Sequence, residues 1–130
     1  MDIEEVGAEE MDLDHIDIVV EDLTASTRFF EMLGFTIVPR TDRPEGDMEL
    51  KFPGSSGIIL ELKASQRMDG TVWPVGLRHM ALRCADIDAA SKTLAAAGVA
   101  FDAPPKFVKN SGRMVTNALG PNGTLLQIVS

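Results

Sequence analysis

The chain has 130 residues, the length of one domain or of two small units that share a core. Apolar residues make up 45% and charged residues 25%, which excludes disordered, collagen-like and coiled-coil chains. The net charge of −8 argues against nucleic-acid binding, and no apolar run is long enough to cross a bilayer. The acidic first ten residues are unlike a secretory signal, and the single cysteine cannot form an internal disulfide, so we expect a cytoplasmic protein.

An internal repeat organises the chain. Residues 13–35 and 77–99 share Leu, His, Asp, Ala and Gly at a constant offset of 64. GIILEL at 57–62 matches GTLLQI at 123–128 at an offset of 66, and a loop insertion explains the difference of two residues. We therefore predict a mobile acidic tail, two modules and a linker between them, with boundaries at 1–12, 13–63, 64–76 and 77–130.

Each module is predicted to fold in the order βαβββ. Residues 14–20 are β-branched and alternating, which predicts a strand. Asp22 and Asp86 stand where a helix N-cap belongs, and Gly34 and Gly98 stand where a left-handed C-cap belongs. The remaining strands are predicted at 36–40, 47–52 and 57–63 in the first module and at 100–102, 113–119 and 124–129 in the second.

The apolar side of the first helix is predicted from its large side chains. Leu23, Phe29, Phe30 and Leu33 supply this stripe, and Leu94 with several alanines supplies a thinner one in the second helix. Both stripes are expected to pack on one face of a sheet.

Strand alternation places four polar side chains on the opposite face of that sheet. His15 and His79 occupy equivalent positions in the repeat, as do Glu61 and Gln127. The chain has two histidines, and both fall on this matched position. Two imidazoles, a carboxylate and an amide oxygen form a donor set suited to Zn²⁺, Ni²⁺, Co²⁺, Mn²⁺ or Fe²⁺, so we expect one divalent metal ion.

Three segments resemble the vicinal oxygen chelate superfamily, which includes glyoxalase I, bleomycin resistance proteins, extradiol dioxygenases and methylmalonyl-CoA epimerase. They are LDHIDIVVEDLTASTRFFEMLGF, GLRHMALRCADIDAASKTLAAAG and LGPNGTLLQIV, and the resemblance covers about residues 13–129. It implies an α+β fold in which two tandem βαβββ modules form a curved, eight-stranded mixed sheet around a metal-binding cavity. The ligand positions of the family fall on His15, Glu61, His79 and Gln127, the last of which is usually Glu.

Other polar residues are candidates for substrate binding. Asp17 and Arg83 are predicted to face the cavity, where they would orient a substrate or pair with each other. Trp73 in the linker would close the mouth of the cavity or cover the edge of the core. Cys84 points to the core by strand parity, which argues against a nucleophilic role.

Three functions are compatible with this pattern. The first is a metal-dependent lyase or isomerase of the glyoxalase I type, acting on a small oxygenated substrate such as a hemithioacetal. Glu61 would then carry the proton, with Asp17 in reserve. The alternatives are a metal-free protein that sequesters a ligand, as in antibiotic resistance, and an extradiol-type dioxygenase, which the amide at Gln127 disfavours. A single module leaves a sheet face and an edge bare, so we also expect a homodimer, with small-molecule ligands and no membrane or nucleic-acid partner.

Overall fold

The computed structural model describes residues 11–40 and 42–130. The predicted tail falls mainly on residues 1–10, which lie outside the described residues, and Asp12 already begins the first strand. Contacts divide the chain into two compact units, one made of His15–Arg78 and the other of residues 11–14 together with His79–Ser130. Each unit is an α+β arrangement of one helix and a mixed sheet.

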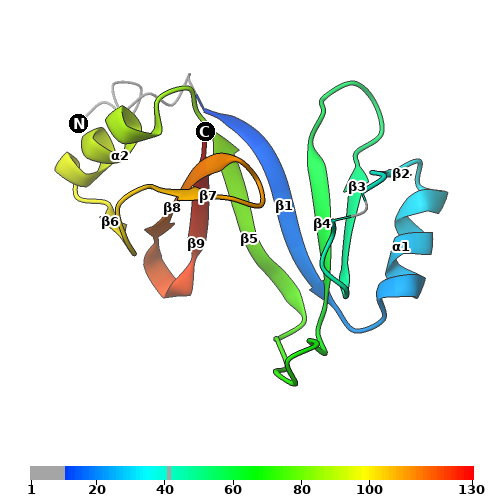
Figure 1. Ribbon diagram of the computed structural model, residues 1–130. Helices are drawn as coiled ribbons and strands as arrows, with labels where there is room; N and C mark the ends of the chain where they lie inside the picture. The colour runs from blue at the N-terminus through cyan, green and yellow to red at the C-terminus, as the bar shows by residue number, and fades with distance from the viewer. Residues whose placement is uncertain (1–10, 41) are drawn as a thin grey trace. The chain divides into compact units, whose positions relative to one another are not determined.

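The first unit contains a four-stranded sheet with the order β2-β3-β4-β1. β1 and β4 run parallel, while β3 is antiparallel to both β4 and β2. The helix α1 packs against β3 and β4 (Figure 1). The elements are β1 (Asp12–Val20), α1 (Leu23–Met32), β2 (Thr36–Ile37), β3 (Asp47–Lys51) and β4 (Ile59–Ala64).

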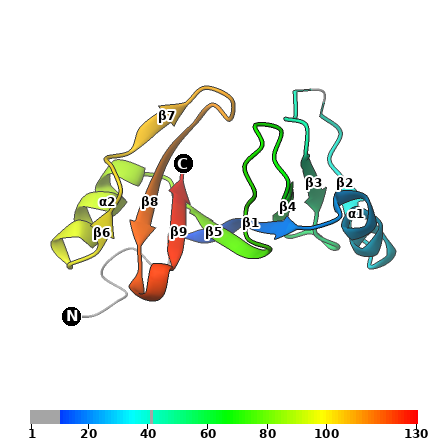
Figure 2. The ribbon, with the colours of Figure 1, turned by 90° about the horizontal axis from the view of Figure 1, so that it is seen from below.

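The second unit repeats this arrangement with the order β5-β9-β8-β6 and with β7 paired to β8. β5 and β9 are parallel, and β8 is antiparallel to its neighbours. Figure 2 shows α2 beside β6 and β8. The elements are β5 (Gly76–Arg83), α2 (Ile87–Ala96), β6 (Ala100–Phe101), β7 (Lys106–Val108), β8 (Arg113–Leu119), a short 3₁₀ turn (Pro121–Gly123) and β9 (Leu125–Val129).

The strand count is one higher than predicted. The described residues form nine strands rather than eight, because β7 pairs with the first half of β8 while β6 pairs with its second half. The strand predicted at 36–40 ends at Ile37, and Pro39 cannot donate a backbone hydrogen bond to extend it. The predicted linker 64–76 holds a small hairpin closed by a bridge between Gln66 and Val72.

The helix ends are formed as predicted, and both modules use the same chemistry. Asp22 accepts a hydrogen bond from the Ala25 N–H at 3.0 Å, and Asp86 accepts one from the Ala89 N–H at 3.0 Å. The chain then leaves each helix through a glycine with positive φ, at +100° for the first helix and +101° for the second. These positions favour glycine because a Cβ atom is strained there. The glycines are Gly34 and Gly98.

The buried stripe of the first helix differs from the prediction. Leu23, Thr27 and Phe30 face the sheet, whereas Phe29 and Leu33 are more than half exposed. The reason is helical spacing, since positions i, i+4 and i+7 share a face and position 29 lies off it. The second helix uses the matching set at an offset of 64, namely Ile87, Ser91 and Leu94.

Each unit has its own hydrophobic core between its helix and its sheet. Leu50, Leu60 and Leu62 form the first core, against which Ile16, Ile18, Met48 and Phe52 pack among others. Cys84, Ile87 and Ile128 form the second, so the buried cysteine is a core residue. No helix among the described residues is long and apolar enough to span a membrane.

Candidate functional site

Three carboxylates form a row across the strands of the first unit. Asp17 on β1 stands directly opposite Glu61 on β4, and Glu61 stands directly opposite Glu49 on β3. Residues in register on neighbouring strands point to the same face. Because Leu50, Leu60 and Leu62 occupy the helix-covered face, this row lies on the other face, as strand parity predicts for Asp17 and Glu61.

The predicted ligands of the first unit lie together. His15 is buried on β1, and its Nε2 atom is 3.9 Å from Oε1 of Glu61. The other carboxylate oxygen of Glu61 is 3.8 Å from Nζ of Lys63. The Glu61 carboxylate therefore lies between an imidazole and an ammonium group, with a quarter of its side chain exposed.

Burial raises the pKa of Glu61, because a carboxylate removed from water is harder to ionise. His15 and Lys63 lower that pKa through electrostatic attraction, while the negative charges of Asp17 and Glu49 raise it further. The net direction is upward. A carboxyl group with a raised pKa is a stronger base than an ordinary carboxylate, which suits it to proton transfer.

Cations balance the remaining acids of this face. Lys63 Nζ donates a hydrogen bond to Asp47 at 2.8 Å, and Arg67 Nη2 donates one to the same carboxylate at 2.9 Å. Arg40 forms an ion pair with Glu49. The face is thus a network of alternating charge, with Glu61 in the middle strand.

Trp73 lies beside the small hairpin within the predicted linker, residues 64–76. The backbone N–H of Trp73 donates a hydrogen bond to the Ser65 carbonyl at 2.9 Å, which closes the hairpin. The guanidinium carbons of Arg67 and Arg78 are each 4.3 Å from the centre of its ring. Arg78 also donates to Asp17 at 3.2 Å. Trp73 therefore belongs to the charged face of the first unit and is held by two cation–π contacts.

The second unit carries the other two predicted ligands. His79 is buried on β5, and Gln127 lies on β9 between Ala81 and Asn117, its partners on the neighbouring strands. Ala81 is the repeat equivalent of Asp17, and Gln127 is that of Glu61. The second module therefore presents an uncharged version of the same row.

Arg83 has a different partner from the one considered in the sequence. It donates to Asp14 at 3.0 Å, and Arg113 binds the same carboxylate through two hydrogen bonds of 2.8 and 3.0 Å. Asp17 pairs with Arg78 instead. Strand parity could not predict this choice, because it gives the face of a side chain but not the direction in which a long arginine bends.

The donor set of the first unit fits part of a metal site. Two ligand atoms that are each about 2.1 Å from a tetrahedral ion lie about 3.4 Å apart, close to the 3.9 Å between His15 and Glu61. An imidazole and a carboxylate are ordinary ligands of divalent transition metals. Within either described unit, no three His, Cys, Asp or Glu side chains converge as a complete site.

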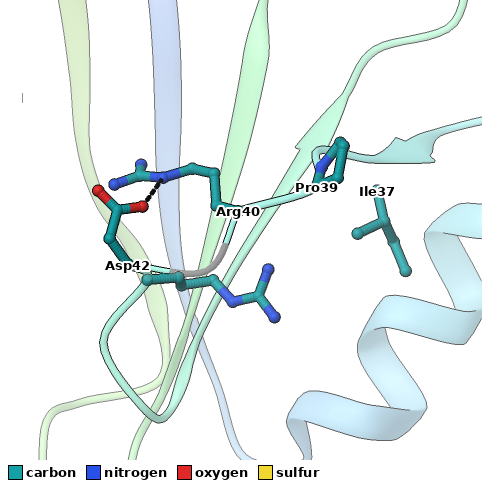
Figure 3. Close-up of a pocket in the computed structure, with 5 residues that line it drawn as sticks. Ile37, Pro39, Arg40 and Asp42 are labelled. Carbon is teal, nitrogen blue, oxygen red and sulfur yellow. Dashed lines mark hydrogen bonds and ion pairs between the residues drawn. The ribbon is translucent and has the colours of Figure 1, made fainter.

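Two surface pockets lie apart from these ligands. One, of about 540 Å³, is lined by Ile37, Pro39, Arg40, Asp42 and Arg43, and Figure 3 shows the Arg40–Asp42 ion pair at its edge. The second, of about 340 Å³, is lined by Asp12, Arg83, Cys84, Ala85 and Ser130. Arg83, a predicted substrate-binding residue, thus borders a pocket on the second unit.

Sequence reasoning missed Glu49 and Asp47 as members of the charged face. The signal was present, because Met48 and Leu50 are the alternate apolar residues of the strand predicted at 47–52, so Asp47 and Glu49 must share its other face. The ion pair between Arg78 and Asp17 had no such signal, since it joins residues 61 positions apart.

A family model for the Glyoxalase/Bleomycin resistance protein/Dioxygenase superfamily matches residues 12–128. The chain therefore belongs to this superfamily, and the resemblance seen in its sequence motifs is confirmed. A search of the curated proteins finds no match.

Solved structures with the same fold include several methylmalonyl-CoA epimerases. The enzyme from Mycobacterium tuberculosis is 22% identical with a TM-score of 0.70, covering 90% of this chain and 85% of the other. A Streptomyces coelicolor methylmalonyl-CoA epimerase in complex with 2-nitronate-propionyl-CoA is 26% identical with a TM-score of 0.69, covering 91% and 92%. A hypothetical protein from Bacillus halodurans is 19% identical with a TM-score of 0.68, covering 92% and 93%.

Proposed function

We propose that the protein is a divalent-metal-dependent isomerase or lyase that moves a proton at a carbon next to a carbonyl group. The observation that carries this proposal is Glu61, a half-buried carboxylate with a raised pKa beside a buried imidazole. A raised pKa makes a carboxylate a stronger base, which favours proton transfer at such a carbon.

The proposed metal ligands are His15, Glu61, His79 and Gln127. A bound ion would act as a Lewis acid that polarises the carbonyl oxygen of the substrate. The two matched histidines support this proposal, because a protein that only binds a ligand has no need of both. The ion is Zn²⁺, Ni²⁺, Co²⁺, Mn²⁺ or Fe²⁺, since this mixed nitrogen and oxygen set suits each of them.

Glu61 is the proposed proton carrier, and Asp17 is the second candidate. Asp17 stands beside Glu61 but is 1% exposed and is paired with Arg78, so it is less accessible to a substrate. Glu61 keeps a quarter of its side chain exposed, which leaves room for contact with a substrate carbon.

The solved structures with the same fold indicate which substrate should be tested first. The Streptomyces enzyme is an epimerase, and its ligand is a CoA thioester. We therefore place a thioester that epimerises at its α-carbon ahead of a glyoxalase-type hemithioacetal. Both reactions need the same proton transfer, so one site serves either substrate.

Solvent exchange tests this function. Methylmalonyl-CoA and the hemithioacetal of methylglyoxal and glutathione are incubated separately in D₂O with protein loaded with each metal, and deuterium at the reacting carbon is followed by NMR. We expect exchange on one of them. Glu61→Gln should slow it by about 10²-fold or more. Asp17→Asn should slow it far less.

Metal content provides the control. The native chain, His15→Ala, His79→Ala and the double variant are purified in parallel, and their metal is measured by elemental analysis. Each single variant should hold less metal than the native chain. Metal retained at the native level after both replacements would overturn the metal site, and absence of exchange on both substrates would overturn the isomerase.

One observation favours a second candidate, a metal-free protein that sequesters a ligand. Lys63 Nζ lies 3.8 Å from Glu61, where it already balances part of the negative charge that a cation would balance. A ligand would then be held by the charged face without chemical change. Ligand binding that is unaffected by chelators, with no deuterium exchange, would select this function.

We also propose that the protein works as a homodimer in the cytoplasm. Several large apolar side chains of the described residues remain more than 60% exposed, among them Val75, Leu77 and Phe107. Such residues suit a contact with a second copy.

A further inference from the structure

Trp73 is held between two arginines that are each fixed by a buried acid. Arg67 and Arg78 both place their guanidinium carbon 4.3 Å from the ring centre. Arg67 is bound to Asp47 on β3, and Arg78 is bound to Asp17 on β1. The hairpin that carries Trp73 is therefore fastened to two strands of the first unit.

The two arginines differ in side-chain exposure and in the number of N–H groups that could bind a ligand. Arg67 has 15% of its side chain exposed and donates to both Asp47 and the Ala64 carbonyl. Arg78 has 41% exposed, and its only hydrogen bond within the described residues goes from Nη1 to Asp17. A guanidinium has five N–H donors, so four of those on Arg78 have no protein acceptor in the described part of the chain.

The geometry of Arg78 is fixed before any ligand arrives. Two contacts hold the guanidinium, namely the Trp73 ring, whose centre is 4.3 Å from the guanidinium carbon, and the hydrogen bond to Asp17. A planar fork held in this way matches a carboxylate, which accepts two parallel hydrogen bonds. Little side-chain entropy is lost on binding, because the arginine is already ordered.

The position of Arg78 relates it to the proposed reaction. Its partner Asp17 is the direct neighbour of Glu61 across the β1–β4 pairing. Arg78 thus contacts the residue that stands next to the proposed proton carrier in the β1–β4 pairing.

We propose that Arg78, stacked on Trp73, binds a carboxylate of the substrate. This inference rests on the proposed function, and it defines the substrate class as small acids or acyl thioesters with a free carboxylate near the reacting carbonyl group. Arg67 has a structural role in this proposal. It is bound to Asp47, contacts the Trp73 ring and does not contact the ligand.

The chain has one tryptophan, so its fluorescence reports on this site. Malonate is titrated into the full chain at constant ionic strength, with chloride as the reference anion, and the titration is repeated in excess EDTA. We expect a saturable change in Trp73 emission with malonate that persists in EDTA. A change no different from that with chloride overturns the proposal, and so does a change that EDTA abolishes.

Two conservative variants separate ligand binding from support of the hairpin. Arg78→Lys keeps a cation beside Asp17 but loses the fork, and it should weaken malonate binding by about tenfold or more. Arg67→Lys should leave malonate affinity within about twofold of the native value. Equal losses in both variants overturn the proposal, because they indicate an effect on the hairpin alone.

The experiments can overturn the proposed isomerase activity and the proposed carboxylate site separately. Malonate binding that depends on Arg78, without deuterium exchange in any substrate, leaves the site standing and removes the isomerase. Deuterium exchange without malonate binding supports the isomerase and removes the carboxylate site. If Arg78→Lys does not fold, as judged by circular dichroism, the malonate and chloride titrations of the native chain still decide the question.

Discussion

Glu61 shows how one residue combines opposing electrostatic effects. Burial disfavours its negative charge, whereas His15 and Lys63 favour it, and burial has the larger effect on its pKa. The folded state therefore binds the Glu61 proton more tightly than the unfolded state does. Ionised Glu61 destabilises the fold, and this penalty grows as pH rises from the ordinary pKa of glutamate through the raised value.

Glu61→Gln should therefore raise the melting temperature at pH 7 in the presence of EDTA. The gain should shrink as pH falls toward about 4, the ordinary pKa of glutamate, where Glu61 becomes protonated and resembles glutamine in charge. Thermal unfolding of both proteins between pH 4 and pH 8 measures this. A variant less stable than the native chain at pH 7 would show that attraction to His15 and Lys63 outweighs burial.

Gln127 is the residue that departs from the family pattern. Gln127→Glu replaces a neutral amide with a charged ligand and should tighten binding of Zn²⁺ or Ni²⁺, because carboxylates bind these ions more strongly than amides do. Competition with a chromophoric chelator gives the affinity. Asn117→Asp adds the same charge at the neighbouring β8 position and serves as the control. Equal affinity of the Gln127→Glu and native proteins would place residue 127 away from the metal.

At the level of elements, the two helices are built by matching residues. Their capping carboxylates, their positive-φ glycines and their buried hydroxyl residues recur at an offset of 64. Thr27 donates to the Leu23 carbonyl at 2.7 Å, and Ser91 donates to the Asp88 carbonyl at 3.1 Å. Each hydroxyl can lie buried against the sheet because it is satisfied within its own helix.

Asp22→Ala removes the N-cap of the first helix and should lower the free energy of unfolding by about 1 kcal/mol. Asp22→Asn keeps the accepting oxygen and should cost much less. Urea unfolding at pH 7 measures both. If the two substitutions cost the same, the charge of Asp22 rather than its hydrogen bond to Ala25 stabilises the helix.

At the level of the whole molecule, the exposed apolar side chains of the described residues predict self-association. Light scattering at micromolar concentration should give twice the mass of the chain. Leu77→Lys places a charge at a side chain that is 62% exposed and should weaken the dimer without affecting either core. A monomeric native protein at this concentration would contradict the dimer.

The sequence by itself determined the repeated units and the face on which their polar residues lie. Helix capping, strand alternation and the 64-residue offset are local or periodic signals, so they predicted the α+β class, both helices and the position of Glu61 opposite the helix-covered face. The family motifs then identified the superfamily. These features depend on backbone geometry, which neighbouring residues largely dictate.

Only the tertiary structure decided how the charges pair. Asp17 binds Arg78 and Asp14 binds Arg83, although a pair between Asp17 and Arg83 was considered from the sequence. The extra strand β7 and the stacking of Trp73 between two arginines were likewise absent from the sequence signal. Long side chains reach several partners of similar energy, and the choice among them depends on how segments distant in sequence pack together.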